Sequence, residues 1–220
     1  MKKIMFNDQY GLTALVLGGK KTMTRRVEGG IRVHGNPSNE IISGIVEMHK
    51  SMNACRSKIS FGSDIEVEIC TRFRVGERVA VAQSYKEILS CGNPLQEELE
   101  REIAEKTGMG HPGCMNKLFV DPKLMPHVIE ITDFRLERLQ SISDGDCIKE
   151  GVVEEVQRIG NMDIKRYHPS PAHVKAMRKV GWGIVRDTPR VAFEELIDCI
   201  SGKGTWDKNP WVVVYEFKLV

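Results

Sequence analysis

The chain has 220 residues, of which 41% are hydrophobic and 28% charged, the composition of an ordinary globular protein. Its 32 Lys and Arg against 30 Asp and Glu leave a net charge of +2, so any binding of a polyanion requires a local basic patch. The N-terminal residues lack the apolar core of a secretory signal, and no segment approaches the roughly 20 apolar residues of a membrane span. We therefore expect a cytoplasmic protein without membrane contact.

The first elements are a short strand and a helix. Lys3 to Phe6 is the strand candidate, and Asn7 or Asp8 is expected to cap the helix that follows. The apolar residues of this helix recur at helical spacing: Leu12, Leu15 and Val16. Gly18-Gly19 ends the helix, since glycine adopts the left-handed conformation that a helix terminus often requires.

A basic run follows the glycine pair and contains four cations and two hydroxyls. It comprises Lys20, Lys21, Thr22, Met23, Thr24, Arg25 and Arg26. From Thr22 onward the period of two predicts a strand. A flat strand starting at Lys21 would place Lys21 and Thr24 on opposite faces, so the two meet only if Lys21 belongs to the preceding turn. Two interpretations remain: a site that holds an anion or activates a hydroxyl, and a solvated turn whose cations favour the helix C-terminus.

The middle of the chain alternates excursions with strands. Residues 28–64 are rich in Gly, Asn and Ser and predict a long mobile excursion with weak strands at 31–34 and 41–48. The segments 65–69 and 78–82 are expected to pair as a hairpin. Asn93-Pro94 opens a helix to about Lys106. Gly108 to Pro126 is a long punctuated loop that we interpret as a candidate lid.

The C-terminal half contains the clearest elements. Val128 to Leu136 is a strand, and Ser143 caps a short helix that runs through Glu150 and stops at Gly151. Asp146 is placed for a reciprocal capping contact. Residues 152–186 look irregular, with a short helix near 172–179. Two strong elements close the chain: a helix from Thr188-Pro189 with an apolar stripe, and an alternating strand from Trp211 to Leu219.

The six cysteines are widely spread and contain no Cys-x-x-Cys pair, so small thiols are favoured over disulfides or structural zinc. We predict no metal and no cofactor. The element pattern indicates an α+β protein with a single domain over residues 1–220.

Several blocks together resemble the ASCH family in its longer phage- and prophage-associated form. The N-terminal block is Met5-Phe6-Asn7 through the basic run that ends at Arg26. The central blocks are Phe73 to Val81 and Arg135 to Gly151. The C-terminal blocks are Phe193 to Ile197, Gly202 to Trp206 and Asn209 to Val212. The resemblance spans most of the chain and leaves insertions near 28–64, 84–126 and 152–187.

The resemblance implies a PUA-like fold, a small β-barrel with helices packed at its openings, and RNA or a modified nucleoside as the ligand. Some small ASCH proteins are amidohydrolases that deacetylate N4-acetylcytidine. Their lysine, threonine and glutamate correspond here to Lys21, Thr24 and Glu150, and the motif arginine to Arg26. A neutral lysine can take the threonine proton, and the glutamate can shuttle it to the leaving amine. An ionised Glu150 close to Lys21 would oppose this by holding the lysine charged.

Further residues are candidate ligand contacts: Lys20, Arg25, Arg26, Lys203 and Trp206. Lys203 suits a phosphate but equally a tight turn, and Trp206 suits base stacking but equally a core position. One hypothesis is that the protein binds RNA or a nucleotide-like ligand in a basic cleft without turnover. The alternative is an amidohydrolase acting through Lys21, Thr24 and Glu150. A third is an interaction protein with an inactive pocket.

Overall fold

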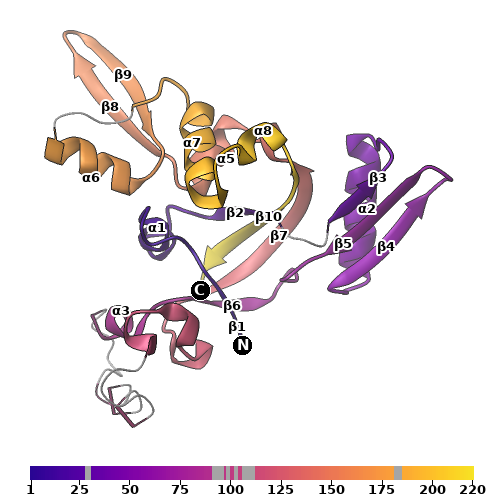
Figure 1. Ribbon diagram of the computed structural model, residues 1–220, viewed down its shortest axis with the longest axis horizontal. Coiled ribbons are helices and arrows are strands. Elements are labelled where there is room, and N and C mark those ends of the chain that lie inside the picture. Colours follow the sequence, from indigo (N-terminus) through magenta and orange to yellow (C-terminus); the bar gives the residue numbers. More distant parts are fainter. Residues whose placement is uncertain (28–30, 91–96, 98–99, 102–103, 106–111, 181–184) are drawn as a thin grey trace. The chain divides into compact units, whose positions relative to one another are not determined.

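The computed structural model describes residues 1–27, 31–90, 97, 100–101, 104–105, 112–180 and 185–220 (Figure 1). Helices and strands are mixed along the chain, which confirms the α+β class. The chain divides into two compact units, one formed by Met1–Phe6, Arg78–Glu130 and Leu219–Val220 and the other by Asn7–Glu77 and Ile131–Lys218. The single domain expected from the sequence stays a prediction.

The first unit is built on three neighbouring strands. β1 (Lys2–Ile4) runs parallel to β6 (Arg78–Val81), and β6 pairs antiparallel with the start of β7 (Val128–Arg138). Around them lie α3 (Tyr85–Ser90) and three 3₁₀ turns, η1 (Pro112–Cys114), η2 (Lys117–Phe119) and η3 (Pro122–Leu124).

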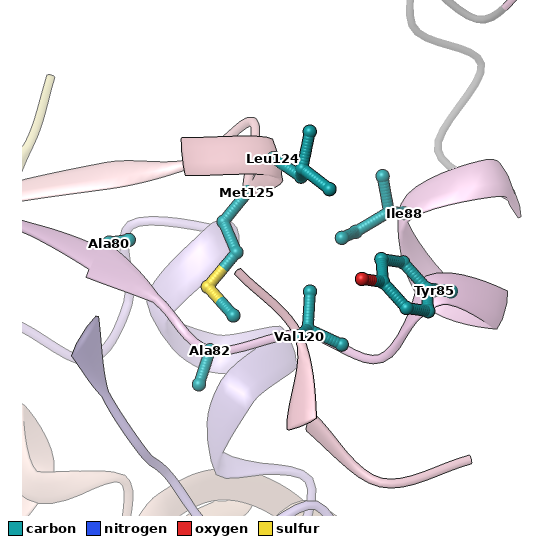
Figure 2. Close-up of a cluster of buried hydrophobic side chains, with 7 residues drawn as sticks. All are labelled: Ala80, Ala82, Tyr85, Ile88, Val120, Leu124 and Met125. Carbon is teal, nitrogen blue, oxygen red and sulfur yellow. The ribbon is translucent and has the colours of Figure 1, made fainter. Parts of the chain in front are cut away.

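A hydrophobic cluster holds this unit together, and Figure 2 shows the side chains of Tyr85, Ile88, Val120 and Leu124 gathered in it. Its buried members are Ala80, Ala82, Tyr85, Ile88, Val120, Leu124 and Met125. The described part of the segment interpreted as a lid, residues 112–126, thus contributes three buried side chains to a core. Close packing accounts for the small residues Ala80 and Ala82, since both are fully buried in this cluster.

The second unit contains three groups of strands. β7 and β10 (Trp211–Leu219) are neighbours, and β10 pairs antiparallel with β2 (Met23–Arg26). A second sheet has the order β3 (Arg32–His34), β5 (Ile65–Cys70), β4 (Arg56–Phe61). β8 (Val153–Ile159) and β9 (Met162–His168) form a separate hairpin. None of these described sheets closes on itself, and the barrel expected from the resemblance stays a prediction.

The helices of the second unit are mostly short. They are α1 (Leu12–Leu17), α2 (Asn39–Ser51), α5 (Asp144–Glu150), α6 (Pro171–Val180), α7 (Pro189–Ser201) and α8 (Thr205–Lys208), with a 3₁₀ turn η4 (Leu139–Ser141). The expected cap of α5 is confirmed, because Ser143 accepts a hydrogen bond from the backbone N–H of Asp146. Thr188 caps α7 in the same way, with Val191 as the donor.

Three sequence predictions about local structure are wrong. Residues 41–48 lie in α2 and are not a strand, because Ser38 caps the helix and Ile42, Ile45 and Val46 recur on its buried face. The segment 65–69 does not pair with 78–82: β5 pairs with β3 and β4, whereas β6 pairs with β1 and β7. Neither Asn7 nor Asp8 caps α1, whose N-cap is the left-handed Gly11.

The hairpin β8–β9 was missed in a region expected to be irregular. Its turn contains Gly160 with φ of 61°, a conformation that glycine adopts without strain. The Gly160-Asn161 pair between two runs of alternating residues was the available signal. The predicted helix at 172–179 is confirmed as α6. The predicted helix beginning at Asn93 falls largely outside the described residues.

Candidate functional site

The basic run starts in a connection and continues in a strand. After α1 the chain turns through Gly19, whose φ is 67°, and the backbone N–H groups of Lys20 and Lys21 both donate to the Leu15 carbonyl. β2 begins only at Met23. Lys21 therefore belongs to the turn, which is the condition that the sequence set for a meeting of Lys21 with Thr24.

Glu150 is the last residue of α5. The left-handed Gly151, with φ of 115°, ends this helix directly after it. The backbone N–H of Thr22 donates to the Lys149 carbonyl over 3.1 Å, so the turn that carries Lys21 is tied to the end of α5. These local features aim Lys21 and Glu150 at each other.

Lys21 and Glu150 form a buried ion pair. The Lys21 Nζ lies 2.7 Å from Glu150 Oε2 and 2.5 Å from the Glu150 carbonyl oxygen. The two residues are only 3% and 5% exposed, although 129 positions separate them in the sequence. Burial lowers the pKa of Lys21 below its usual 10.5; Glu150 opposes this shift, and the positive charges of Arg26 and Arg25 add to it.

Arg25 joins this pair to two more carboxylates. Its guanidinium NH1 lies 3.1 Å from Glu150 Oε1, and NH2 lies 2.5 Å from Glu137 Oε1 and 3.2 Å from Asp146 Oδ2. The residue is 6% exposed. We predicted Arg25 as a ligand contact, but the structure directs its donors to protein acceptors and buries them.

The network contains three residues that the sequence analysis did not identify, namely Glu137, Arg135 and Glu216. Arg135 on β7 binds Glu137 over 2.9 Å and Asp146 over 2.7 Å, and it reaches Glu216 on β10 over 2.6 Å. Asp146 does not make the reciprocal cap we predicted in α5, since its carboxylate faces these arginines. The available signal was the alternation of charged residues within β7, Arg135 and Glu137, which places both on one face.

Thr24 occupies a different position. It pairs with Tyr215 in the register of β2 and β10, so the two side chains share one face of the sheet, opposite to that of Arg25. Tyr215 is fully buried on that face and packs edge-on against Phe73 at 5.4 Å between ring centres. The structure thus brings Lys21 and Glu150 into contact, whereas the convergence of Thr24 with them stays a prediction.

The other predicted ligand residues have varied surroundings. Lys20 is exposed and Arg26 half-buried. Lys203 is exposed beside an open groove of about 440 Å³ along α7, where acidic residues outnumber basic ones. The groove is lined by Arg186, Val191, Glu194, Glu195, Asp198, Cys199 and Lys203. This acidic majority does not favour a phosphate beside Lys203.

Trp206 is a core residue in this structure rather than an open stacking surface. It is 7% exposed and packs against Phe193 at 6.2 Å between ring centres, while the Arg190 guanidinium lies 5.3 Å from its ring. Its burial follows from α8, which begins after Gly204 and turns the indole toward α7.

Other chemistries find little support near the Lys21–Glu150 pair. Burial raises the pKa of the Cys147 thiol to about 12, so this neighbour on α5 stays protonated and is a poor nucleophile near pH 7. Within the described ranges no three His, Cys, Asp or Glu side chains are grouped to hold a metal ion. None of the helices in the described part of the chain has the length and apolar character needed to cross a bilayer.

No family model, curated protein or solved structure matches this chain.

Proposed function

We propose that this chain hydrolyses an acyl amide on a nucleobase, of the N4-acetylcytidine type, with Lys21 as the base, Glu150 as the proton carrier and Thr24 as the nucleophile. One observation carries the proposal. Lys21 and Glu150, two of the three residues selected by their resemblance to the ASCH amidohydrolases, lie 2.7 Å apart at a buried position.

The pair has a property that a base requires. A lysine accepts a proton only in its neutral form, and burial lowers the pKa of Lys21 below its usual 10.5, which favours that form. The ionised Glu150 would oppose that loss of charge, but its other oxygen faces the permanently charged Arg25. Neutral Lys21 therefore does not leave the carboxylate without a counter-charge.

The reaction proceeds in two balanced halves. The Thr24 hydroxyl attacks the amide carbon while its proton passes to Lys21, and collapse of the tetrahedral intermediate breaks the carbon–nitrogen bond. The departing nucleobase amine receives that proton through Glu150, which leaves an acyl ester on Thr24. Water then attacks this ester, and one of its protons passes to Lys21 and from there to the departing Thr24 oxygen. The acid is released, and Thr24 and neutral Lys21 are restored.

We further propose that the chain has the PUA-like fold of the ASCH family. The order of its motifs supports this fold, as do the neighbouring strands β7, β10 and β2, the last two antiparallel, with α5 adjacent to β2. Backbone amide contacts measured by NMR between edge strands would establish closure of a barrel. An open sheet in solution would contradict the fold without bearing on the Lys21–Glu150 contact.

The direct test is release of cytidine from N4-acetylcytidine, measured by chromatography for the wild-type chain, Lys21→Met and Thr24→Val. We expect turnover by the wild type and a loss of about 10²- to 10⁴-fold in Lys21→Met, the usual contribution of a positioned base. Arg32→Met, which removes an exposed cation with 70% side-chain exposure, serves as the matched control. Absence of turnover by the folded wild type would refute the proposal.

A second candidate is binding of RNA or a nucleotide-like ligand without turnover. The position of Thr24 on the face opposite to Arg25 favours it, because a nucleophile there lacks the demonstrated contact with the base. Lys20, which is exposed, and Arg26, which is half-buried, would then contact the phosphate groups of the RNA. This candidate predicts no cytidine release but salt-dependent binding of single-stranded RNA that Lys20→Gln weakens. If neither cytidine release nor RNA binding is observed, the third hypothesis remains, an interaction protein with an inactive pocket.

A further inference from the structure

Both oxygens of the Glu150 carboxylate are engaged, each by a different cation. Oε2 lies 2.7 Å from the Lys21 amine and Oε1 lies 3.1 Å from Arg25 NH1. Two contacts on opposite oxygens fix the rotation of a carboxylate that a single contact would leave free. The orientation of Glu150 toward Lys21 therefore depends on Arg25.

Arg25 has no capacity left for a ligand. A guanidinium has five N–H donors, and here Nε and NH2 bind Glu137, NH2 also binds Asp146, and NH1 binds Glu150 and the Met23 sulfur. With 6% exposure the group is also closed to solvent. Such a residue acts on chemistry only through the side chains that it holds.

The acids that hold Arg25 are themselves held. Glu137 presents Oε1 to Arg25 and Oε2 to Arg135, over 2.5 and 2.9 Å. Asp146 Oδ2 accepts from both arginines, over 3.2 and 2.7 Å. Side chains of β7 and α5 thus hold the Arg25 guanidinium in place. It has little freedom to move with Glu150 if that carboxylate is displaced.

We infer that Arg25 is a positioning residue that fixes the Glu150 carboxylate against Lys21 and supplies its counter-charge when Lys21 is neutral. The inference rests on the proposed function for its catalytic consequence, but the geometry stands without it. It also goes beyond the family motif, which selects Lys21, Thr24, Glu150 and Arg26 and leaves position 25 unassigned.

The charges around Lys21 give the inference a measurable sign. Glu150 faces it from α5, and Arg25 and Arg26 face it from β2. Replacing Arg25 by glutamine removes a positive charge that repels the Lys21 ammonium. It also leaves Lys21 as the only one of these two cations that interacts with the Glu150 carboxylate. Both changes favour the ammonium form, so Lys21 would lose its proton at a higher pH than in the wild type.

The experiment follows the Lys21 ammonium by NMR of the full chain labelled with ¹⁵N-lysine, with the signal assigned by its absence in Lys21→Met. We expect its titration midpoint to move upward in Arg25→Gln, with a smaller movement in Arg25→Lys. Arg32→Met, which removes an exposed cation outside this network, is the control and is expected to leave the midpoint in place. An unchanged midpoint in folded Arg25→Gln would overturn the inference.

Kinetics provide the second readout. At pH 7 we expect kcat for N4-acetylcytidine to fall about 10- to 100-fold in Arg25→Gln with little change in KM, since no ligand contact is lost. Higher pH and the Arg25→Lys variant should each restore part of the rate. Equal kcat in all three proteins would contradict the positioning role. If Arg25→Gln does not fold, Arg25→Lys decides the outcome by the same two measurements.

Failure of the two proposals can be told apart. A wild type that releases no cytidine refutes the hydrolase, while the Lys21 titration still tests Arg25. Conversely, turnover that requires Lys21 but is indifferent to Arg25 supports the hydrolase and rejects the positioning role.

Discussion

Lysines with ammonium groups held by protein oxygens occur in both units of this chain, and their surroundings differ. In the first unit Lys3 donates to three backbone carbonyls, those of Lys117, Leu118 and Val120, over 2.7 to 2.9 Å. In the second unit Lys21 donates to one carbonyl and one carboxylate of Glu150. Burial lowers the pKa of both lysines.

The difference lies in what deprotonation would cost. Lys3 uses all three of its N–H donors to satisfy three carbonyls. Loss of a proton would therefore leave one carbonyl oxygen facing the nitrogen lone pair of the neutral amine. The carboxylate beside Lys21 is shared with Arg25, which stays charged at any physiological pH. Burial of a lysine is therefore not in itself a sign of chemistry, and the sharing of its partner is the distinguishing feature.

The largest effect is expected on replacing Arg25. Arg25→Met would remove one of the cations that hold each of Glu137, Asp146 and Glu150. Removal of one member of a buried ion pair typically costs about 3–5 kcal/mol. Urea unfolding should show this loss. Arg32→Met, at a pair separated by 3.5 Å with 70% exposure of the arginine, should change stability by less than about 0.5 kcal/mol. Equal losses in the two variants would show that the network contributes no more than a surface pair.

Lys3→Met tests the other side of the comparison. The three carbonyls lose a charged donor, but the contact at Leu118 is exposed and water can replace it there, so we expect a loss of about 1–2 kcal/mol. The exposed Lys123 in η3 provides the control Lys123→Met. Release of cytidine per folded molecule should stay unchanged in Lys3→Met. A proportional loss of turnover would contradict the separation between a structural lysine and a chemical one.

A smaller effect is expected at Gly151, beside the carboxylate end of α5. Its φ of 115° strains any other residue, and an added Cβ would lie 2.9 Å from a methyl group of Leu12. We expect Gly151→Ala to cost about 1 kcal/mol and to weaken the Lys21 contact with the Glu150 carbonyl. Gly145→Ala in the same helix is the matched control, since an added Cβ there meets nothing within 4 Å. Greater stability of both variants would contradict this account.

The smallest effect at neutral pH concerns the proton of Lys21. Its folded pKa lies below the value of 10.5 that the unfolded chain retains, so between these two values the unfolded chain binds more protons. The free energy of unfolding therefore rises with pH through that window. Below the window the folded protein carries the full free-energy cost of burying the Lys21 charge. The measurement is the free energy of unfolding of the wild type and of Lys21→Met from pH 7 to 10. The difference between the two proteins gives the contribution of Lys21, because the other titrating groups are the same in both. A difference independent of pH would exclude a lowered Lys21 pKa.

Local signals in the sequence predicted much of the secondary structure. Ser143 and Gly151 bracket α5 because a hydroxyl caps the free N–H groups and glycine accepts the left-handed terminus. The alternation of 211–219 defined β10, and the resemblance selected Lys21 and Glu150 from positions far apart in the chain. These signals act within a few residues, or within a recognised motif, and need no knowledge of the packing.

The tertiary structure decided which distant partners these elements have. Strand propensity identified β5 and β6 but could not choose between pairing them with each other and with other strands, because every strand edge offers the same donors and acceptors. Likewise the sequence presented Arg25 as one more cation of an exposed run. Only the sheet order β7-β10-β2, together with the packing of α5 against β2, surrounds it with three carboxylates. Side-chain direction follows from strand register, and register is set by long-range pairing.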